Sequence, residues 1–119
     1  MDEIVLYDRY GQAVYRLCGS VFYDYLGKPR GLLVTSTVYD LRGQHRGFLI
    51  GGVLRDRMGR IVGFAEGARV EGLKLPYVDI PGVPYKNLPA PETPAGLCCL
   101  ECPAAPPLWS VMRLENLLV

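Results

Sequence analysis

A five-residue motif recurs at a constant interval of 16 residues through the first half of the chain. Tyr-Asp-x-x-Gly begins at Tyr7, Tyr23 and Tyr39, and the fourth copy begins at Arg55 with the Asp and Gly retained. Units of this length cannot each bury an apolar face alone, so stacking or closing the four copies must create one shared core. A composition of 50% hydrophobic and 21% charged residues is typical of a folded chain and not of a disordered one.

Each copy is predicted to form a β-hairpin. Ile4–Tyr7 is a short run of strand-forming residues, and Asp8–Gly11 has the chemistry of a tight turn. An Asp at the start of a turn accepts a hydrogen bond from the backbone two residues further on, and Gly tolerates a positive φ. Gln12–Cys18 is the returning strand, and a two-residue loop leads to the next copy. The predicted turn residues are Asp8 and Gly11, Asp24 and Gly27, Asp40 and Gly43, and Asp56 and Gly59, and the loops are Gly19-Ser20, Thr35-Ser36, Gly51-Gly52 and Gly67-Ala68.

Two apolar columns support this register. The residues two positions before each Asp are Leu6, Phe22, Val38 and Leu54, and those nine positions after it are Leu17, Leu33, Leu49 and Ala65. The two-residue loops place each residue of the second column opposite the first-column residue of the next copy, on one face that we expect to be the core. The other face is mixed, with Arg16 opposite Tyr23 and Glu66 opposite Arg69.

The turn register and a glycine column add detail to the hairpins. The parity of the apolar residues favours Asp8 opposite Gly11, whereas a bulge at the Gly would shift the facing of the returning strand by one residue. Seven residues after each Asp stand Tyr15, Gly31, Gly47 and Gly63. A recurring glycine on the inner face indicates strands that bend sharply or approach an axis closely.

The four hairpins are predicted to close into a ring with pseudo-four-fold symmetry. Closure removes exposed sheet edges, and copies of constant length favour a ring over an open stack. Arg69-Val70 continues the pattern and is expected to add a partial strand that seals the ring against Ile4–Leu6. The predicted fold class is therefore all-β, with a four-repeat domain over residues 1–71.

The character of the chain changes at about Gly72. Nine of the ten prolines lie within residues 72–108, which we interpret as an irregular or polyproline-like arm. Its apolar residues indicate that it packs on the ring: Leu73, Leu75, Tyr77, Val78, Ile80, Val83, Tyr85 and Leu88. Residues 107–118 could form a short helix, because Leu108, Val111 and Met112 would share one side. Arm and helix together make up the second predicted unit, residues 72–119.

The repeated motif resembles that of the four-fold beta flower proteins, a small bacterial family of four hairpin petals around a pseudo-four-fold axis. The resemblance covers residues 4 to about 68, and the fourth copy departs from it at Arg55. It implies a fold but no settled activity, so it assigns no catalytic residues. The YD repeats of Rhs-type toxins and the PRC-barrel domains share parts of the motif, but the former have a longer period and the latter usually lack four copies.

The four turn aspartates are candidate ligands for a hard cation, since symmetry would arrange their carboxylates in a ring. The favoured interpretation is that each Asp caps its own turn. Catalysis by a carboxylate pair is not expected, because symmetry gives all four the same environment and acid–base work needs two pKa values pushed apart.

Cys98, Cys99 and Cys102 form the candidate metal site. Zinc needs four ligands, and Cys18 or His45 could supply the fourth. A disulfide within the arm or between chains, and plain free thiols, are the alternatives. A thioredoxin-like role is not expected without a βαβ setting, and His45, the only histidine, has no partner that would make a catalytic triad.

A formal net charge of +1 gives no reason to expect a nucleic-acid or membrane partner. Basic and aromatic residues at the turn tips could bind single-stranded nucleic acid, but a solvated rim is the favoured interpretation. These tip residues are Arg9, Tyr10, Tyr25, Lys28, Arg42, Arg57 and Arg60. No signal peptide and no apolar run of about 20 residues is recognised, and three cysteines within five residues are a poor disulfide framework, so a reducing cytoplasm is expected.

The sequence therefore predicts a non-catalytic structural or protein-interaction module without a cofactor. Self-association through Trp109, Met112 and Leu117 is one expected mode. The alternative is a module that binds metal at the cysteine cluster or a ligand on the axis or turn-tip face. An enzyme of unfamiliar type would need a pocket lined by residues that break the four-fold pattern, which are Tyr15, His45 and Arg55.

Overall fold

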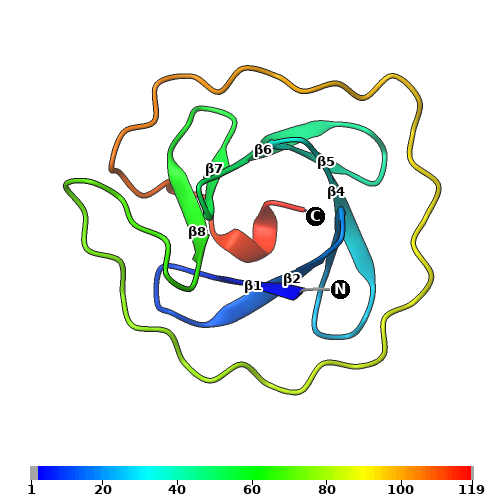
Figure 1. Ribbon diagram of the computed structural model, residues 1–119, viewed down its shortest axis with the longest axis horizontal. Helices are drawn as coiled ribbons and strands as arrows, with labels where there is room; N and C mark the ends of the chain where they lie inside the picture. The colour runs from blue at the N-terminus through cyan, green and yellow to red at the C-terminus, as the bar shows by residue number, and fades with distance from the viewer. Residues whose placement is uncertain (1–2, 119) are drawn as a thin grey trace.

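The computed structural model describes residues 3–118 and shows a closed antiparallel β-barrel (Figure 1). Each strand pairs with the next, and β8 pairs with β1, so no edge of the sheet is left open. The strands are β1 (Glu3–Tyr7), β2 (Ala13–Cys18), β3 (Val21–Tyr23), β4 (Pro29–Val34), β5 (Thr37–Asp40), β6 (His45–Ile50), β7 (Val53–Asp56) and β8 (Ile61–Ala65). The prediction of an all-β fold built from four hairpins is confirmed.

The seal between the first and last hairpins differs from the prediction. Leu6 pairs directly with Ala65, and Tyr7 pairs with Phe64. Because β8 already reaches β1, no partial strand at residues 69–70 is needed, and Val70 instead forms a bridge with Leu73. The predicted closing strand was wrong, and so was the pairing of Glu66 with Arg69, since the chain leaves the barrel at this point.

The inner face of the barrel carries both apolar columns. Leu17 pairs with Phe22, Leu33 with Val38, and Leu49 with Leu54, as the two-residue loops predict. The first-column residues Leu6, Phe22, Val38 and Leu54 are fully buried in the inner core. The loops at Gly19-Ser20, Thr35-Ser36 and Gly51-Gly52 lie at one end of the barrel, which we call the mouth.

The Asp-x-x-Gly turns contain two register shifts each. In the first hairpin the N–H of Gly11 donates to the carbonyl of Asp8, and the N–H of Asp8 donates to the carbonyl of Gln12, so Asp8 is opposite Gln12 and not Gly11. A second shift follows between Leu6 and Tyr7. Two shifts of one residue restore the original parity, which is why the inner face was predicted correctly although the turn register was not.

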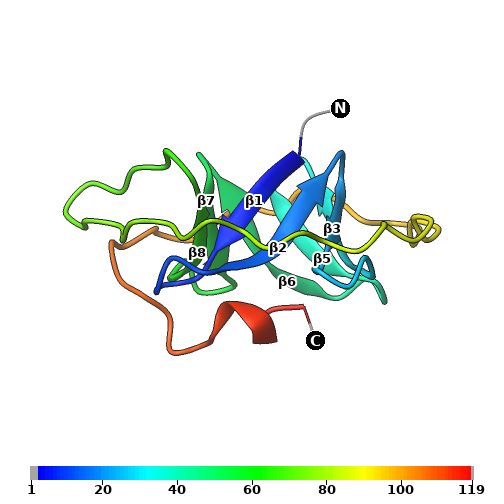
Figure 2. The same ribbon diagram turned by 90° about the horizontal axis from the view of Figure 1, so that it is seen from below.

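The tail lies across the other end of the barrel (Figure 2), and its apolar side chains join the inner core as a plug. The predicted helix over residues 107–118 was wrong for most of its length: only the short 3₁₀ helix η1 (Leu114–Asn116) forms. Residues 108–110 are extended because they pair with β8, where the N–H of Ile61 donates to the carbonyl of Leu108 and the N–H of Ser110 to that of Ile61. Leu114, Leu117 and Leu118 fill the barrel end.

The inward glycines make room for this plug and for neighbouring backbone. A Cβ at Gly31 would lie 2.8 Å from Cδ2 of Leu118, and one at Gly63 would lie 2.9 Å from Cδ2 of Leu114. A Cβ at Gly47 would meet the carbonyl of Arg55. The predicted close approach of strands to an axis is therefore seen here as close approach to the plug and to the next strand.

The Pro-rich arm runs around the outside of the barrel and passes the four hairpins in turn (Figure 1). It covers an outer layer that is largely apolar and also contains the buried polar residues Arg16, Thr37 and Arg55. The buried residues of this layer include Tyr7, Tyr23, Leu32, Tyr39, Phe48 and Phe64. The barrel wall is thus buried on both faces, from the inside by the plug and from the outside by the arm.

Candidate functional site

The arm touches each turn tip through the turn glycine. A Cβ at Gly11 would meet the carbonyl oxygen of Tyr77, and a Cβ at Gly27 would meet that of Lys86, nine residues further along the arm. Both glycines also accept a hydrogen bond of 2.8 Å from the arm, from the N–H of Asp79 and of Leu88 respectively. The turn glycines are therefore the docking points of the arm as well as positive-φ residues, with φ of 81° at Gly11 and 80° at Gly27.

Two buried arginines anchor the arm from the outer face of the barrel. Arg16 donates to Oδ1 of Asn87 at 2.6 Å, and Arg55 donates to the carbonyl of Pro106 at 3.0 Å. Burial lowers the pKa of Arg55, opposed by the nearby Cys102 and then Asp56. Arg16 stands where the other repeats have leucine or phenylalanine, and Arg55 stands where they have tyrosine. These two breaks in the repeat tie the barrel to the arm by charge-assisted hydrogen bonds.

Between the arginines, Tyr39 and Thr37 hold the next part of the arm. The Tyr39 hydroxyl donates to the carbonyl of Cys98 at 2.5 Å, and the N–H of Leu100 donates to Oγ1 of Thr37 at 2.8 Å. Every hairpin therefore contributes contacts that fix the path of the arm.

The outward face of the arm is apolar over residues 77–88. Tyr77, Ile80 and Val83 are 89%, 96% and 93% exposed. We call the exposed set Tyr77, Ile80, Val83, Tyr85 and Leu88 the outer ridge. Val78, Pro81, Pro84 and Asn87 are half-buried at a spacing of three residues, the repeat of a polyproline helix with one side on the barrel. The arm lies on the ring, as its apolar residues indicated, but the side chains of the ridge do not make that contact. Residues with this repeat on the barrel side leave the others facing solvent.

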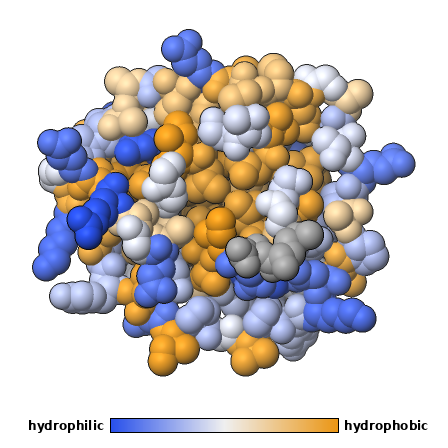
Figure 3. Space-filling model, viewed as in Figure 1, coloured by the Kyte–Doolittle hydropathy of each residue, from blue (hydrophilic) through white to orange (hydrophobic). Residues whose placement is uncertain are grey.

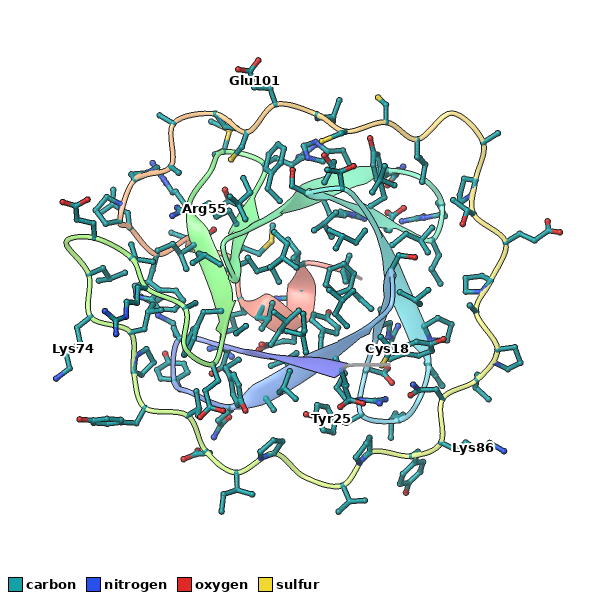
Figure 4. All side chains as sticks on the ribbon, viewed as in Figure 1. Cys18, Tyr25, Arg55, Lys74, Lys86 and Glu101 are labelled. Carbon is teal, nitrogen blue, oxygen red and sulfur yellow. The ribbon has the colours of Figure 1, made fainter. Side chains whose placement is uncertain are left out.

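Lysines flank the outer ridge. Lys74 and Lys86 point away from the barrel (Figure 4), and the Nζ of Lys74 lies 5.8 Å from the ring centroid of Tyr77. The ridge is thus a mainly apolar strip that carries two exposed lysines and the exposed Asp79.

The turn aspartates share one interaction and differ in another. In each, Oδ1 accepts the N–H groups of the residues two and four positions further on, at 2.9 to 3.0 Å. The second oxygen, Oδ2, accepts from Nε of Arg30 at Asp24 (2.9 Å), from Nε of Arg46 at Asp40 (3.0 Å) and from Oγ of Ser110 at Asp56 (2.6 Å). The expectation of identical environments was therefore wrong.

Burial and charge have opposite effects on the pKa of each of the two Arg-paired carboxylates, Asp24 and Asp40. Burial raises the pKa of Asp24, but the N–H of Lys28, the Arg30 guanidinium and the N–H of Leu26 together hold it below the ordinary value. The same balance lowers the pKa of Asp40. At Asp8, no side chain or N–H among residues 3–118 donates to Oδ2.

A cavity of ≈220 Å³ lies between the first turn tip and the tail. Asp8, Arg9 and Tyr10 line it from the tip, and Trp109 and Ser110 line it from the tail. The Arg9 guanidinium lies 5.4 Å from the Trp109 ring centroid. This is a place where the four-fold pattern breaks, because the tail enters the barrel between the last hairpin and the first.

The mouth of the barrel presents a second apolar surface. Figure 3 shows hydrophobic side chains gathered at the centre of this face. Leu33, Leu49 and Ala65 of the inner face are only partly buried, and Ile4 is 42% exposed. The inner core thus reaches solvent at the end away from the plug.

The cysteines predicted as a metal site have different surroundings. Sγ of Cys99 lies 3.6 Å from Oγ of Ser36, Cys102 is half-buried near Arg55, and Cys98 is exposed. Within residues 3–118 no three His, Cys, Asp or Glu side chains are grouped to hold a metal ion. A tetrahedral zinc site needs four ligands around one point, so zinc binding at these cysteines stays a prediction. All four cysteines are free thiols in this single chain, and a disulfide between chains stays a prediction.

The predicted additional ligands, Cys18 and His45, lie apart from the cysteine cluster. Cys18 Sγ accepts from the Asn87 amide at 3.6 Å. The His45 ring packs edge-on against Phe48 at 4.8 Å. Of the other residues that break the four-fold pattern, Tyr15 donates from its hydroxyl to the carbonyl of Glu115 at 3.2 Å and Arg55 holds the arm.

The tail residues predicted to mediate self-association differ in their exposure to solvent. Leu117 is buried in the barrel core, whereas Met112 is exposed and Trp109 is half-buried beside the cavity. Leu117 therefore cannot contact a second copy while the plug is in place. The outer ridge and the cavity were both missed, although a signal for each exists: the three-residue spacing in the arm, and the change from Arg to Val six residues after Asp8 and Asp56.

A family model described as "4-fold beta flower protein" matches residues 4–118. The match includes the arm and the plug as well as the four repeats. Comparison with curated proteins and with solved structures finds no match. No helix within residues 3–118 is both long enough and apolar enough to cross a bilayer.

Proposed function

From the membership of this chain in the four-fold beta flower family, which names a fold and no activity, we propose that it is a non-catalytic protein-interaction module that binds its partner through the outer ridge. The observation that carries the proposal is the exposure of Tyr77, Ile80 and Val83, each at least 89%. Large side chains gathered in this way are typical of interaction surfaces.

The backbone under the outer ridge is held before any partner arrives. Hydrogen bonds of 2.8 to 3.0 Å tie Asp79, Tyr85 and Leu88 to the tips of the first two hairpins. Little backbone entropy is then lost on binding, which favours affinity for a strip of this modest size. The fold thus supports the ridge as a rigid, extended ligand for another protein.

The partner that fits is a different protein with an apolar groove edged by carboxylates. Lys74 and Lys86 would meet those carboxylates at the rim of the interface and speed association. Two copies of this chain joined ridge to ridge would bring these lysines toward each other, which disfavours self-association at this surface. The four free thiols are in keeping with our proposal of a cytoplasmic location.

Photocrosslinking tests the proposal. A benzoylphenylalanine residue is placed at Tyr77, at Val83 or at Val111, which is 93% exposed but lies on the tail. We expect the same partner to be crosslinked from positions 77 and 83 and not from 111, and the crosslink to weaken when Lys74 and Lys86 are both changed to Glu. Equal capture from position 111, crosslinked homodimers, or no effect of charge reversal would contradict the proposal.

A further inference from the structure

We infer that the cavity between the first turn tip and the tail is a binding site for a guanidinium group. This site is independent of the outer ridge and of the function proposed for it. It is lined by Asp8, Val62, Trp109, Ser110 and Leu114, among others. Its ≈220 Å³ is below the roughly 300–1,000 Å³ typical of drug-sized ligands, so it suits a group of side-chain size.

The repeats of the barrel show what a turn aspartate binds. In the second and third hairpins, Oδ2 of the Asp accepts a hydrogen bond from the Nε of an arginine six residues further on, Arg30 and Arg46. The residue at that position in the first hairpin is Val14, which supplies no donor. Asp8 therefore has the carboxylate but not the guanidinium that Asp24 and Asp40 have beside them.

In the fourth hairpin a valine again stands in place of the arginine, but a residue of the tail donates to the aspartate. Val62 replaces the arginine there, and Ser110 of the tail supplies the donor to Asp56 at 2.6 Å. Ser110 is thus engaged at Asp56. Among residues 3–118, Asp8 is the turn aspartate whose Oδ2 receives no donor, and it lines the cavity.

The remaining lining suits the rest of an arginine-like ligand. Val62, Met112 and Leu114 offer apolar contact to an alkyl stem. Arg9 also lines the cavity, and its guanidinium lies 5.4 Å from the Trp109 ring centroid, so a guanidinium is already compatible with this lining. Arg113 and Glu115 pair with each other at 3.7 Å, so their charges largely cancel at the cavity edge. The group bound at Asp8 can belong to a free small molecule or to an arginine side chain of a peptide.

Titration of the whole protein with defined compounds tests the inference. The probes are free arginine and Nα-acetyl-arginine-methylamide, each with its citrulline counterpart, which has a similar shape but no charge. Chemical-shift changes at the indole N–H of Trp109, the single tryptophan, report occupancy. We expect the citrulline compounds to bind about 10- to 100-fold more weakly, the range for loss of a hydrogen bond to a charged group. Preference for the capped compound identifies a peptide source, and preference for free arginine identifies a small molecule.

Two variants locate the site. Asp8→Asn keeps the side-chain oxygen that caps the turn and removes the charge, and Val14→Arg supplies the internal guanidinium found in the second and third hairpins. Both should abolish the arginine-dependent shifts, whereas Glu92→Gln on the exposed face of the arm should leave them unchanged. Equal binding of arginine and citrulline compounds, no binding at millimolar concentration, or unchanged binding by Asp8→Asn would overturn the inference. The ligand comparison on the unmodified protein decides the matter even if a variant fails to fold.

Discussion

At the scale of single residues, the turn glycines combine backbone strain with a steric requirement. Gly27 has a φ of 80°, and any Cβ there would meet the carbonyl of Lys86 in the arm. Gly67 has a φ of 86°, but a Cβ there would have no atom within 4 Å. The two positions therefore differ in contact with the arm while sharing the conformational cost of a side chain.

We expect Gly27→Ala to destabilise the protein more than Gly67→Ala. The positive φ alone should cost about 1 kcal/mol at either position, and displacement of the arm should add about 1–3 kcal/mol at Gly27. Urea unfolding of both variants gives the difference in free energy of unfolding. Equal losses would show that the arm yields without cost and is not held at this tip.

His45 makes stability depend on pH. Burial lowers the pKa of His45 below the ordinary 6.5, opposed by its hydrogen bond to the carbonyl of Gly47. The unfolded chain then binds a proton more readily than the folded one, so the free energy of unfolding is full above about pH 7.5 and falls as pH drops through 6.5. Urea unfolding at pH 7.5 and 5.5 should show this loss, and His45→Gln should remove it. A wild-type protein equally stable at both pH values would contradict the assignment.

At the scale of elements, the hairpins could be predicted because two apolar columns repeat with a constant period. The double register shift at each turn could not, since the shifts at Gly11 and at Leu6/Tyr7 add up to two residues and leave the inner face unchanged. The longer helix predicted in the tail was wrong because tertiary pairing overrides the local pattern. The leucines of the tail are spaced as in a helix, but pairing of Trp109 with Ile61 keeps the preceding residues extended.

The plug stabilises the barrel through its leucines. Leu117 is 1% exposed and belongs to the inner core, so Leu117→Ala should cost about 2–5 kcal/mol, the usual range for leucine truncation in a core. Val111→Ala, on the exposed part of the same tail, is the matched control and should change stability by less than about 0.5 kcal/mol. The midpoint of urea unfolding measures both, and a Leu117→Ala loss as small as that of the control would show that the plug is dispensable.

At the scale of the whole molecule, the path of the arm could not be predicted from its composition. Prolines predict an extended chain, and apolar residues predict contact with something, but neither says which side faces the barrel. The three-residue spacing of Val78, Pro81, Pro84 and Asn87 carries that information once a polyproline repeat is assumed. One column of the repeat likewise indicates that the first hairpin differs at Asp8, because Val14 stands there in place of an arginine.

The division into residues 1–71 and 72–119 stays a prediction. The layers of the fold indicate that each part needs the other for its stability. Tyr39, Phe48 and Phe64 of the outer layer are at most 5% exposed under the arm, and the barrel end is filled by the plug. Removing residues 72–119 would expose both surfaces, and the lost free energy of burial should exceed the typical 5–15 kcal/mol stability of a domain.

We expect residues 1–71 alone to bind a hydrophobic dye and to lack a cooperative urea transition. Addition of a peptide comprising residues 72–119 should restore both the transition and the near-UV circular dichroism. Cooperative unfolding of residues 1–71 without the peptide would instead show that the barrel is a domain in its own right, with the arm as an accessory.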